Sequence, residues 1–550
     1  MGWLAVAVAA SLATIAAGLV PAAAQASAPG GSTVVPGGRA GPVVTYHTGT
    51  PGVARLVPRV AHPATSAGNR ALQRGARRLP SGTFSATEAV PGARAPAAAA
   101  AATAAPLANF NGVSSRDSQF TNYNLKFEPP DQGLCMGNGF VLEAVNSAYR
   151  IYGTRGKTVR GPFNINDLFN VGGKEFTSDP RCWFDPTTQT WFATILFIND
   201  SSTRGALLIA VRHNPNPLGL WNEYSINTTD IANGCPCFGD QPRIGIDQHN
   251  LYVTDDEFSI KGPQFLGAEV WAFNKAELVA GATSLHFVRF PYLRVDGQLT
   301  LAPQPALSVG TPRAEYFLSS LDFAGQGDNR IAAWAMTKPQ LVGTGRMPVL
   351  SSVVINSQGY ANPPRAPQKG ATSKINSGDD RMQQTAFAAG TVWGELTTAV
   401  RPSGDSQVRA GGAWFQVRPT LGASGITGAS IVRQGFIDAA GQYVLYPAVQ
   451  PDAAGNAAAV FTLTGSNRFP SAAFATLTAG ASSFGPPVVA AAGAGPYDKK
   501  ATRWGDYSFA VPDPSSDAAW LATEYVPPRS SQTTNGVRNW GTRVIKVPLH

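Results

Sequence analysis

The sequence predicts an all-β fold, most simply a β-propeller with seven blades, and three observations support this. Short apolar strands alternate with turns rich in Asp, Asn and Gly, as in the hairpin over residues 239–258, GDQPRIGIDQHNLYVTDDEF. Similar hairpins recur at a spacing of roughly fifty to seventy residues. The repeat contains only strands, and a long repeat of this kind is typical of the radial arrangement of a propeller.

Each repeat begins at an anchor residue, usually an aspartate. The anchors are Asp131, Asp179, Asp240, Asp380 and Asp506, with degenerate copies that start at Thr311 and Tyr446. Seven anchors predict seven blades, and six would result if one degenerate copy is not a blade. In many propellers a terminal strand completes a blade begun at the other chain end, which removes an open edge. We expect residues 110–127 to close the ring in this way against a last strand over 542–547.

The residues before the propeller are predicted to be a leader and a linker. Residues 2–26 are apolar, rich in Ala and uncharged, and small residues follow, so residues 1–28 are interpreted as an export signal, with a retained membrane anchor as the alternative. Residues 29–107 are largely Ala, Pro, Gly and Ser and predict a disordered linker. The propeller is expected over 108–550. No other apolar run is long enough to span a bilayer once the signal is cleaved.

The positive charge of the chain is concentrated in this linker. The whole chain has a net charge of +9, and residues 29–107 contain eight arginines, one acid and no lysine, which gives +7. The linker is interpreted as a solvated tether, with contact to anionic envelope polymers or nucleic acid as the alternative. We expect a secreted monomer without a nucleic-acid partner.

Four cysteines in an exported chain favour disulfides. Cys135 and Cys182 occupy similar positions in consecutive repeats, so they would bridge neighbouring inner strands. A strained bond between Cys235 and Cys237, and a bond from Cys237 to Cys182, are the alternatives. No second cluster of Cys or His has the spacing of zinc ligands.

Polar residues at the starts of the inner strands are the main candidates for a binding site. In a propeller these positions surround the central channel, although they are far apart in sequence. The candidates are Asp131, Asp179, Asp240, Asp380 and Asp506, with the nearby Arg181, Arg243, Arg381 and Arg503. Carboxylates facing one axis repel one another unless arginines or a cation such as Ca²⁺ pair with them. They would bind a sugar acid or an oligosaccharide; alternatively, each Asp holds its own turn and the next blade.

Other motifs give weaker signals. Asp255, Asp256 and Glu257 form the densest acidic run and are candidates for Ca²⁺, with a solvated loop as the alternative because the spacing of a calcium loop is absent. Glu524 and Tyr525 are neighbours on a predicted strand, so they would point to opposite faces. Trp504 and Trp540 are candidates for stacking on sugar rings.

Two stretches resemble the sialidase-like and neuraminidase-repeat propellers of secreted bacterial proteins. They are DPRCWFD at 179–185, followed by TWF at 190–192, and RWGDY at 503–507, followed by residues 513–525. The resemblance lies in the blade pattern over most of 120–550 and implies the propeller fold. The chain contains no good copy of the Asp-box, Ser-x-Asp-x-Gly-x-x-Trp, that sialidases carry on several blades.

The predicted function depends on the polar residues expected at the channel mouth. We expect a secreted propeller that binds a carbohydrate or another extracellular or cell-envelope polymer there. The alternatives are a sialidase-like glycoside hydrolase that uses carboxylates of the ring, and a scaffold for protein partners on the flat face of the propeller.

Overall fold

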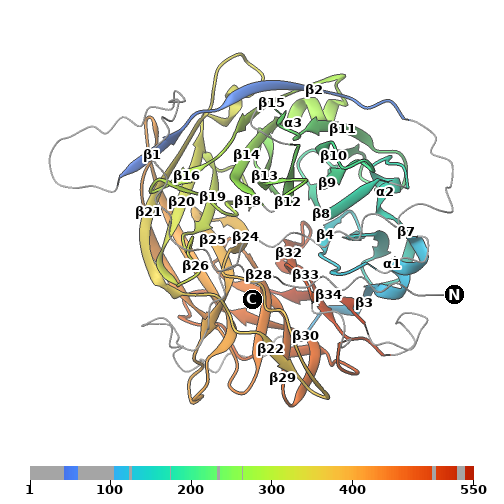
Figure 1. The fold of residues 1–550 in the computed structure, drawn as a ribbon, viewed down its shortest axis with the longest axis vertical. Coiled ribbons are helices and arrows are strands. Elements are labelled where there is room, and N and C mark those ends of the chain that lie inside the picture. The colour runs from blue at the N-terminus through green and yellow to red at the C-terminus, as the bar shows by residue number, and fades with distance from the viewer. Residues whose placement is uncertain are drawn as a thin grey trace, which may run out of the picture. The chain divides into compact units, whose positions relative to one another are not determined.

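The computed structural model describes eight stretches of the chain, which are residues 43–59, 105–122, 127–173, 175–231, 236–262, 264–497, 503–528 and 539–549. Within them, antiparallel strands form almost the whole structure, and small sheets follow one another around a central axis (Figure 1). The protein is a β-propeller, as the sequence predicts. The predicted export signal over 1–28 and most of the predicted linker lie outside the described residues.

The first three blades follow chain order as antiparallel meanders of four strands. Blade one consists of β4 (Gly133–Gly137), β5 (Phe140–Val145), β6 (Ala148–Gly153) and β7 (Thr158–Asn164). Blade two consists of β8 (Phe176–Asp185), β9 (Thr190–Ile198), β10 (Gly205–His213) and β11 (Asn222–Asn227). Blade three consists of β12 (Cys237–Ile246), β13 (Asn250–Ser259), β14 (Phe265–Asn274) and β15 (Ser284–Phe290).

The next three blades repeat this arrangement. Blade four consists of β18 (Gln304–Ser308), β19 (Ala314–Ser320), β20 (Asp328–Thr337) and β21 (Val349–Tyr360). Blade five consists of β24 (Met382–Ala388), β25 (Thr391–Val400), β26 (Arg409–Gly422) and β27 (Gly425–Ile437). Blade six consists of β28 (Tyr443–Pro451), β29 (Ala457–Gly465), β30 (Arg468–Leu477) and β31 (Val488–Ala491).

The last sheet joins the C-terminal strands to a strand that precedes blade one in the sequence. It consists of β32 (Phe509–Pro512), β33 (Ala518–Tyr525), β34 (Gly541–Pro548) and the early strand β3 (Ala108–Ser114), which pairs with β34 (Figure 1). Glu143 of β5 secures the seam to blade one, because its carboxylate accepts hydrogen bonds from the Val113 N–H at 2.9 Å and from the Thr542 hydroxyl. The predicted closure is therefore confirmed, although the pairing strand covers 108–114 and so overlaps the expected range 110–127 only at 110–114.

Short elements lie in the connections between the strands. They are helices α1 (Ser115–Thr121), α2 (Ile165–Leu168) and α3 (Lys275–Ala280), the 3₁₀ helix η2 (Pro339–Leu341), the strand pair β16 (Arg294–Val295) and β17 (Gln298–Leu299), and the pair β22 (Ala366–Gln368) and β23 (Ala371–Ile375). No helix in the described part of the chain has the length and hydrophobicity that crossing a membrane requires.

The prediction of a wholly disordered linker over 29–107 is wrong for residues 43–59. Two strands in this range, β1 (Val44–His47) and β2 (Thr50–Arg55), pair with the outer strands β21 and β15. Leu56 then forms a bridge to Tyr224 of β11. We call residues 43–59 the belt, because they run along the outer edges of blades four, three and two (Figure 1). The belt buries few of its own side chains, so its sequence lacks the apolar alternation that would have predicted strands.

The predicted start of blade four at Thr311 is also wrong. Thr311 follows the inner strand β18, and the stretch from 311 covers a turn and the second strand β19. β18 is only five residues long and has no Asp anchor, which explains why the repeat pattern missed it. It instead pairs in parallel with both neighbouring inner strands, through Leu307 to Ile246 of β12 and to Ala386 of β24.

A disulfide joins the inner strands of blades one and two. Cys135 and Cys182 are bonded, with their Cα atoms 5.5 Å apart. This confirms the pairing expected from their equivalent repeat positions and excludes the bond between Cys182 and Cys237. Cys237 is also disulfide-bonded, and Cys235 lies outside the described residues.

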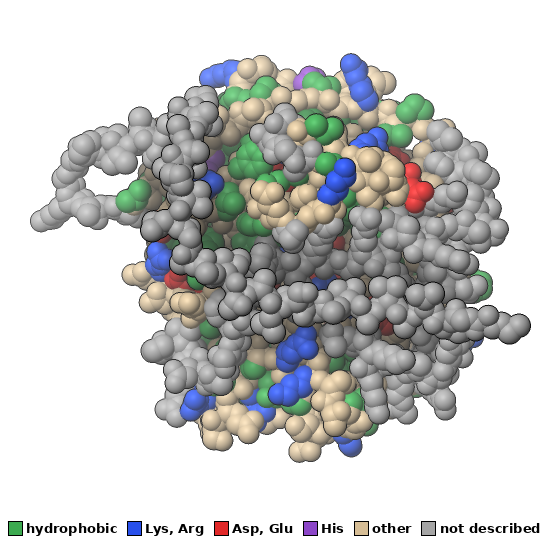
Figure 2. All heavy atoms as spheres, in the orientation of Figure 1, with side chains coloured by type: hydrophobic (Ala, Val, Ile, Leu, Met, Phe, Trp, Pro, Cys, Tyr) green, Lys and Arg blue, Asp and Glu red, His purple; other side chains and the backbone are tan. Residues whose placement is uncertain are grey.

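Figure 2 shows the charged side chains on the described part of one face. Lys and Arg side chains lie at separate places around the described surface, and apolar and uncharged groups lie between them. The polar residues that the repeats bring together are instead buried near the axis.

Candidate functional site

A backbone irregularity recurs where the inner strands begin. Asp179, Gln241, Ala302 and Tyr446 have φ angles of 59°, 50°, 45° and 52°, and each is followed directly by proline. In three of the four cases the strand pairing shifts register at this point, as in a β-bulge. Proline has no N–H to contribute to the ladder, so the bulge leaves no donor unpaired there. The extra residue in each bulge changes the direction of the side chains that follow it near the axis.

Three of the predicted aspartates belong to one hydrogen-bond network. The Asp131 carboxylate accepts the backbone N–H of Asp506 at 2.8 Å and the side-chain amide of Asn146 at 2.8 Å. The Asn146 carbonyl oxygen accepts the Asp179 N–H at 2.6 Å, and the Tyr507 hydroxyl donates to Asp179 at 3.1 Å. Blade one, blade two and the last sheet therefore meet through buried polar side chains.

Asp240 joins these residues electrostatically, and we call Asp131, Asp179, Asp240 and Asp506 the axial cluster. Burial, and then the nearby Asp179, raise the pKa of Asp240 well above its usual value. Burial and then Asp506 raise the pKa of Asp179 to about 6, and the same two causes raise the pKa of Asp131 well above its usual value. These carboxyl groups therefore retain protons at a pH where an exposed Asp is ionised.

The four predicted arginines stabilise this region in different ways. Arg243 is buried and donates to Asp256 at 2.6 Å and to Gln241 at 3.1 Å. Arg181 is also buried, and its guanidinium lies 3.3 Å from the centre of the Tyr507 ring. Both are structural neighbours of the cluster rather than exposed groups.

The other two arginines reach solvent. The side chain of Arg503 is 19 % exposed and pairs with Asp506, which is 12 % exposed. Arg381 is 12 % exposed and holds Asp379 through two hydrogen bonds of 2.7 and 2.6 Å, while it also donates to Gln241 at 3.1 Å. The charge of Asp506 also acts on Arg381, so the Asp379–Arg381 pair and the Arg503–Asp506 pair lie near each other. We call Asp379, Arg381, Arg503 and Asp506 the axial mouth.

Asp380 does not join the cluster, contrary to the sequence prediction. Burial, and then the neighbouring Asp322, raise its pKa well above the usual value, so its carboxyl group lies beside Asp322 in the connection between β19 and β20. Asp379 faces Arg381 instead. Burial opposes ionisation of Asp379, but Arg381 outweighs it and holds the pKa of Asp379 below its usual value. Adjacent residues point in different directions, so the pattern could not decide which aspartate faces the axis.

The acidic run is divided between two faces of β13. Asp256 faces the axis, where it pairs with Arg243 and accepts the Ala302 N–H at 3.0 Å. Glu257 lies on the other face, where burial and then Glu269 raise its pKa to about 11. The three residues Asp255, Asp256 and Glu257 therefore do not converge as the ligand set that was predicted for Ca²⁺.

A different set of three acidic residues lies close enough together to resemble a group of metal ligands. Oxygen atoms of Asp230, Glu257 and Glu269 lie within 4.8 Å of one another. However, the Arg289 Nη2 atom lies among them, 3.1 Å from Asp230 and 3.5 Å from Glu257, and it also pairs with Glu269. The guanidinium thus takes the place that a cation would need. Sequence analysis missed Asp230, Glu269 and Arg289, because they come from different strands and loops with no shared motif.

Glu524 and Tyr525 were predicted to point to opposite faces of their strand. Glu524 faces the axial cluster, whereas the Tyr525 hydroxyl lies near Asn111 of β3, so the two do point to opposite faces as expected.

Trp504 and Trp540 are both fully buried and cannot stack on a ligand from solution. They pack in the core because their ring N–H groups find partners in Thr462 and Phe127.

Comparisons with known proteins yield only structural matches. No protein-family model matches the chain, and no curated protein matches it in sequence. Solved structures that match include an exo-β-1,3-galactanase from Clostridium thermocellum (11 % identity, TM-score 0.30, 80 % of this chain and 96 % of that one). A GH93 α-L-arabinofuranosidase of Fusarium graminearum (10 %, 0.32, 80 % and 98 %) and the endosialidase of phage phi92 (9 %, 0.32, 80 % and 69 %) also match. The propeller assignment itself rests on the sheet topology described above.

Proposed function

We propose that this protein is an exported binding propeller that holds a carbohydrate, or another hydroxyl-rich extracellular polymer, at the axial mouth. The observation that carries the proposal is the pairing of Arg381 with Asp379 and of Arg503 with Asp506 at one end of the axis. Carboxylates accept and guanidinium groups donate hydrogen bonds, and a sugar hydroxyl does both. Convergent polar groups of this kind are what orient small ligands in protein sites.

The buried axial cluster adjoins the axial mouth, because Asp506 belongs to both. Asp131 and Asp179 are tied to backbone and side-chain donors, so their arrangement is fixed before a ligand arrives. A preformed site loses less conformational entropy on binding. Export is part of the proposal because of the predicted signal over 1–28 and the disulfides, which persist in oxidising compartments.

Binding is tested with the full chain against a panel of oligosaccharides and polysaccharides by isothermal titration calorimetry. Arg381→Gln removes the charge that pairs with Asp379, and we expect at least about tenfold weaker binding. Arg212→Gln is the matched control, because Arg212 donates to the carbonyls of Asn216 and Leu220 at the far end of blade two. Equal loss in both variants, or no binding by the wild type across the panel, would contradict the proposal.

A glycan-cleaving enzyme is the second candidate function. It is favoured by Asp179, whose pKa of about 6 suits a general acid and whose Oδ2 atom has no hydrogen-bond partner among the described residues. Because Asp179 is fully buried, this function requires the axial mouth to open onto it. Release of reducing sugar from the same panel, measured from pH 4 to 8, tests it. Activity that is lost in Asp179→Asn while polysaccharide binding persists would establish the enzyme; binding without any released sugar rejects it.

A further inference from the structure

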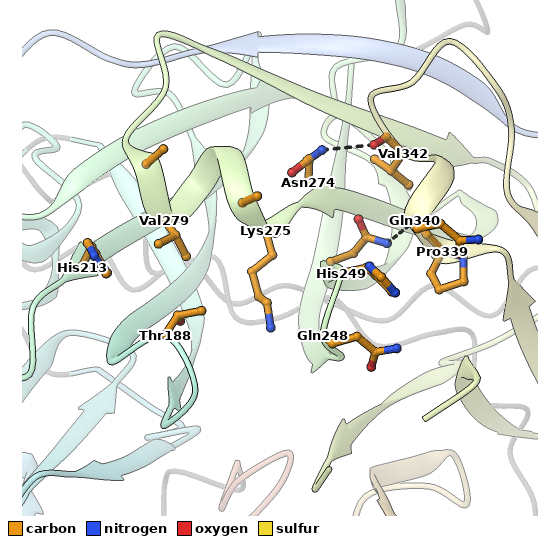
Figure 3. Close-up of a pocket in the computed structure, with 13 residues that line it drawn as sticks. Thr188, His213, Gln248, His249, Asn274, Lys275, Val279, Pro339, Gln340 and Val342 are labelled. Carbon is orange, nitrogen blue, oxygen red and sulfur yellow. Dashed lines mark hydrogen bonds between the residues drawn. The ribbon is translucent and has the colours of Figure 1, made fainter. Parts of the chain in front are cut away.

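A pocket lies between blades two, three and four, away from the axial mouth. Its volume is about 550 Å³, within the range of roughly 300–1,000 Å³ that is common for small-molecule sites. Helix α3 and the 3₁₀ helix η2 contribute to its walls (Figure 3). The residues that line it are Thr188, His213, Gln248, His249, Asn250, Asn274, Lys275, Ala276, Val279, Ala280, Pro339, Gln340 and Val342.

The pocket and the axial cluster are at different ends of blade three. Asp240 lies near the start of β12, whereas Gln248 and His249 occupy the turn after its end. A strand rises about 3.3 Å per residue, so the two places are separated by roughly 20 Å along the strand. A ligand in this pocket would therefore be independent of the one at the axial mouth.

The polar groups that face the pocket include both hydrogen-bond donors and acceptors. Lys275 points into it (Figure 3), and its ammonium group bonds to the Asp247 carbonyl and lies 3.1 Å from Asp185, which leaves the third N–H for a ligand. The Thr190 hydroxyl donates to the Thr188 carbonyl at 3.0 Å, so it accepts the Nδ1–H of His213 at 2.9 Å, and the His213 Nε2 atom is left as an acceptor. The His249 ring forms no hydrogen bond with any described residue. No Asp or Glu is among the lining residues.

Apolar side chains lie among these polar groups, with Val279 on one side of Lys275 and Pro339 and Val342 on the other (Figure 3). Ala276 and Ala280 add small apolar surfaces from α3. A sugar ring also carries both kinds of surface, with C–H groups on its faces and hydroxyl groups around its edge. Gln248 donates its amide to the Pro312 carbonyl at 2.9 Å, which leaves its own carbonyl oxygen to accept from a hydroxyl.

We propose that this pocket is a second ligand site, which binds a sugar of monosaccharide or disaccharide size that carries a carboxylate. The carboxylate accepts hydrogen bonds from Lys275 and His249, the sugar hydroxyls donate to His213 and Gln248, and the ring packs against the apolar side chains. Asp185 offsets part of the Lys275 charge, so the preference for an acidic sugar comes from hydrogen bonding as well as charge.

The test uses the full chain and two matched pairs of sugars. D-Glucuronate is compared with D-glucose, and D-galacturonate with D-galactose, by saturation-transfer NMR and calorimetric titration. We expect at least one uronate to bind about tenfold more tightly than its neutral partner. Absence of saturation transfer to both uronates, or equal binding of acid and neutral sugar, overturns the proposal.

Two tryptophan variants locate the binding. Ala276 is exposed at the pocket, so Ala276→Trp fills it without disturbing the core and is expected to weaken uronate binding at least tenfold, about the loss of one good contact. Ala423 is exposed in the turn between β26 and β27, and Ala423→Trp is the control that should bind like the wild type. Uronate binding that survives Ala276→Trp but is lost in Arg381→Gln would place the acid at the axial mouth and reject the second site.

Discussion

At the scale of residues, the protein concentrates carboxyl groups where they are costly to ionise. Asp131, Asp179 and Asp240 are buried near one another, and the arginines beside them compensate only part of the repulsion. A buried carboxyl group whose pKa is raised binds its proton more tightly in the folded than in the unfolded chain. Folding is therefore coupled to protonation of these three carboxyl groups.

This coupling predicts that the protein loses stability as the pH rises from about 4 to 6. Asp179 has a pKa of about 6 in the folded protein against 3.8 unfolded, so the folded state holds the extra proton in this window and the stabilisation disappears above it. Two pKa units correspond to about 3 kcal/mol of unfolding free energy at most. Asp131 and Asp240 act in the same direction. Urea unfolding measured at intervals from pH 4 to 8 tests this.

Asp179→Asn serves as the matched variant in that experiment. The amide has the shape of the protonated carboxyl group but does not ionise, so the slope of stability against pH between 4 and 6 should flatten. A wild-type protein that becomes more stable over this range, or an Asn variant with an unchanged slope, would contradict the assigned coupling.

The sequence predicts which residue types meet near the axis but not how they are oriented. Asp131, Asp179, Asp240 and Asp506 were found because each opens an apolar strand. The choice between Asp379 and Asp380 depends on the local backbone, which the hairpin pattern does not specify. A feature that the sequence does show at several inner strands is a proline near the strand start, as in Gln241-Pro242 and Tyr446-Pro447, where the residue before it has a positive φ. It marks inner strands even where the aspartate is missing.

At the scale of elements, blades one and two are joined more firmly than packing alone requires. Cys135 of β4 and Cys182 of β8 cross-link the two inner strands over a separation of 47 residues. The backbone also fits closely there, because a Cβ atom added at Gly133 would lie 2.7 Å from the Pro180 carbonyl oxygen. These contacts hold Asp131 and Asp179 in neighbouring positions.

Removal of the cross-link should destabilise the protein without changing its fold. Closing a loop of this length restricts the unfolded chain, and the entropy model assigns it about 4 kcal/mol. We expect the double variant Cys135→Ser and Cys182→Ser to lose about 2–4 kcal/mol in guanidinium unfolding. Reduction of both proteins in denaturant should abolish the difference between them. A double variant as stable as the oxidised wild type would show that blade packing alone fixes this seam.

At the scale of the whole molecule, the fold was predictable and the belt was not. The hairpin repeat and the closing strand follow from alternation and turn residues, which are local signals. The belt is held by backbone pairing to strands that lie more than two hundred residues further along, and such pairing leaves no pattern in the belt itself. Blade four was misplaced for a related reason, since its inner strand is stabilised by parallel pairing to both neighbours.

The belt should be part of the stable propeller rather than a removable tether. β2 covers the edge of β15 and β1 covers the edge of β21, so their loss would expose two unpaired outer strands, which promotes aggregation. We therefore expect a chain that starts at residue 107 to melt at lower temperature and to aggregate more readily than one that starts at residue 43. Light scattering during thermal unfolding measures both effects.

Adjacent residues of β2 provide the sharper form of this prediction. Ala54 is 6 % exposed and packs in the core with Leu285, whereas the neighbouring Val53 is 50 % exposed. Ala54→Asp places an unpaired charge in that core and should cost about 2–4 kcal/mol, while Val53→Asp should change stability by only about 0.5 kcal/mol. Hydrogen exchange of the β15 amides should accelerate in Ala54→Asp alone, because the belt no longer protects that edge. Equal stability and equal exchange in the two variants would mean that the propeller does not depend on its belt.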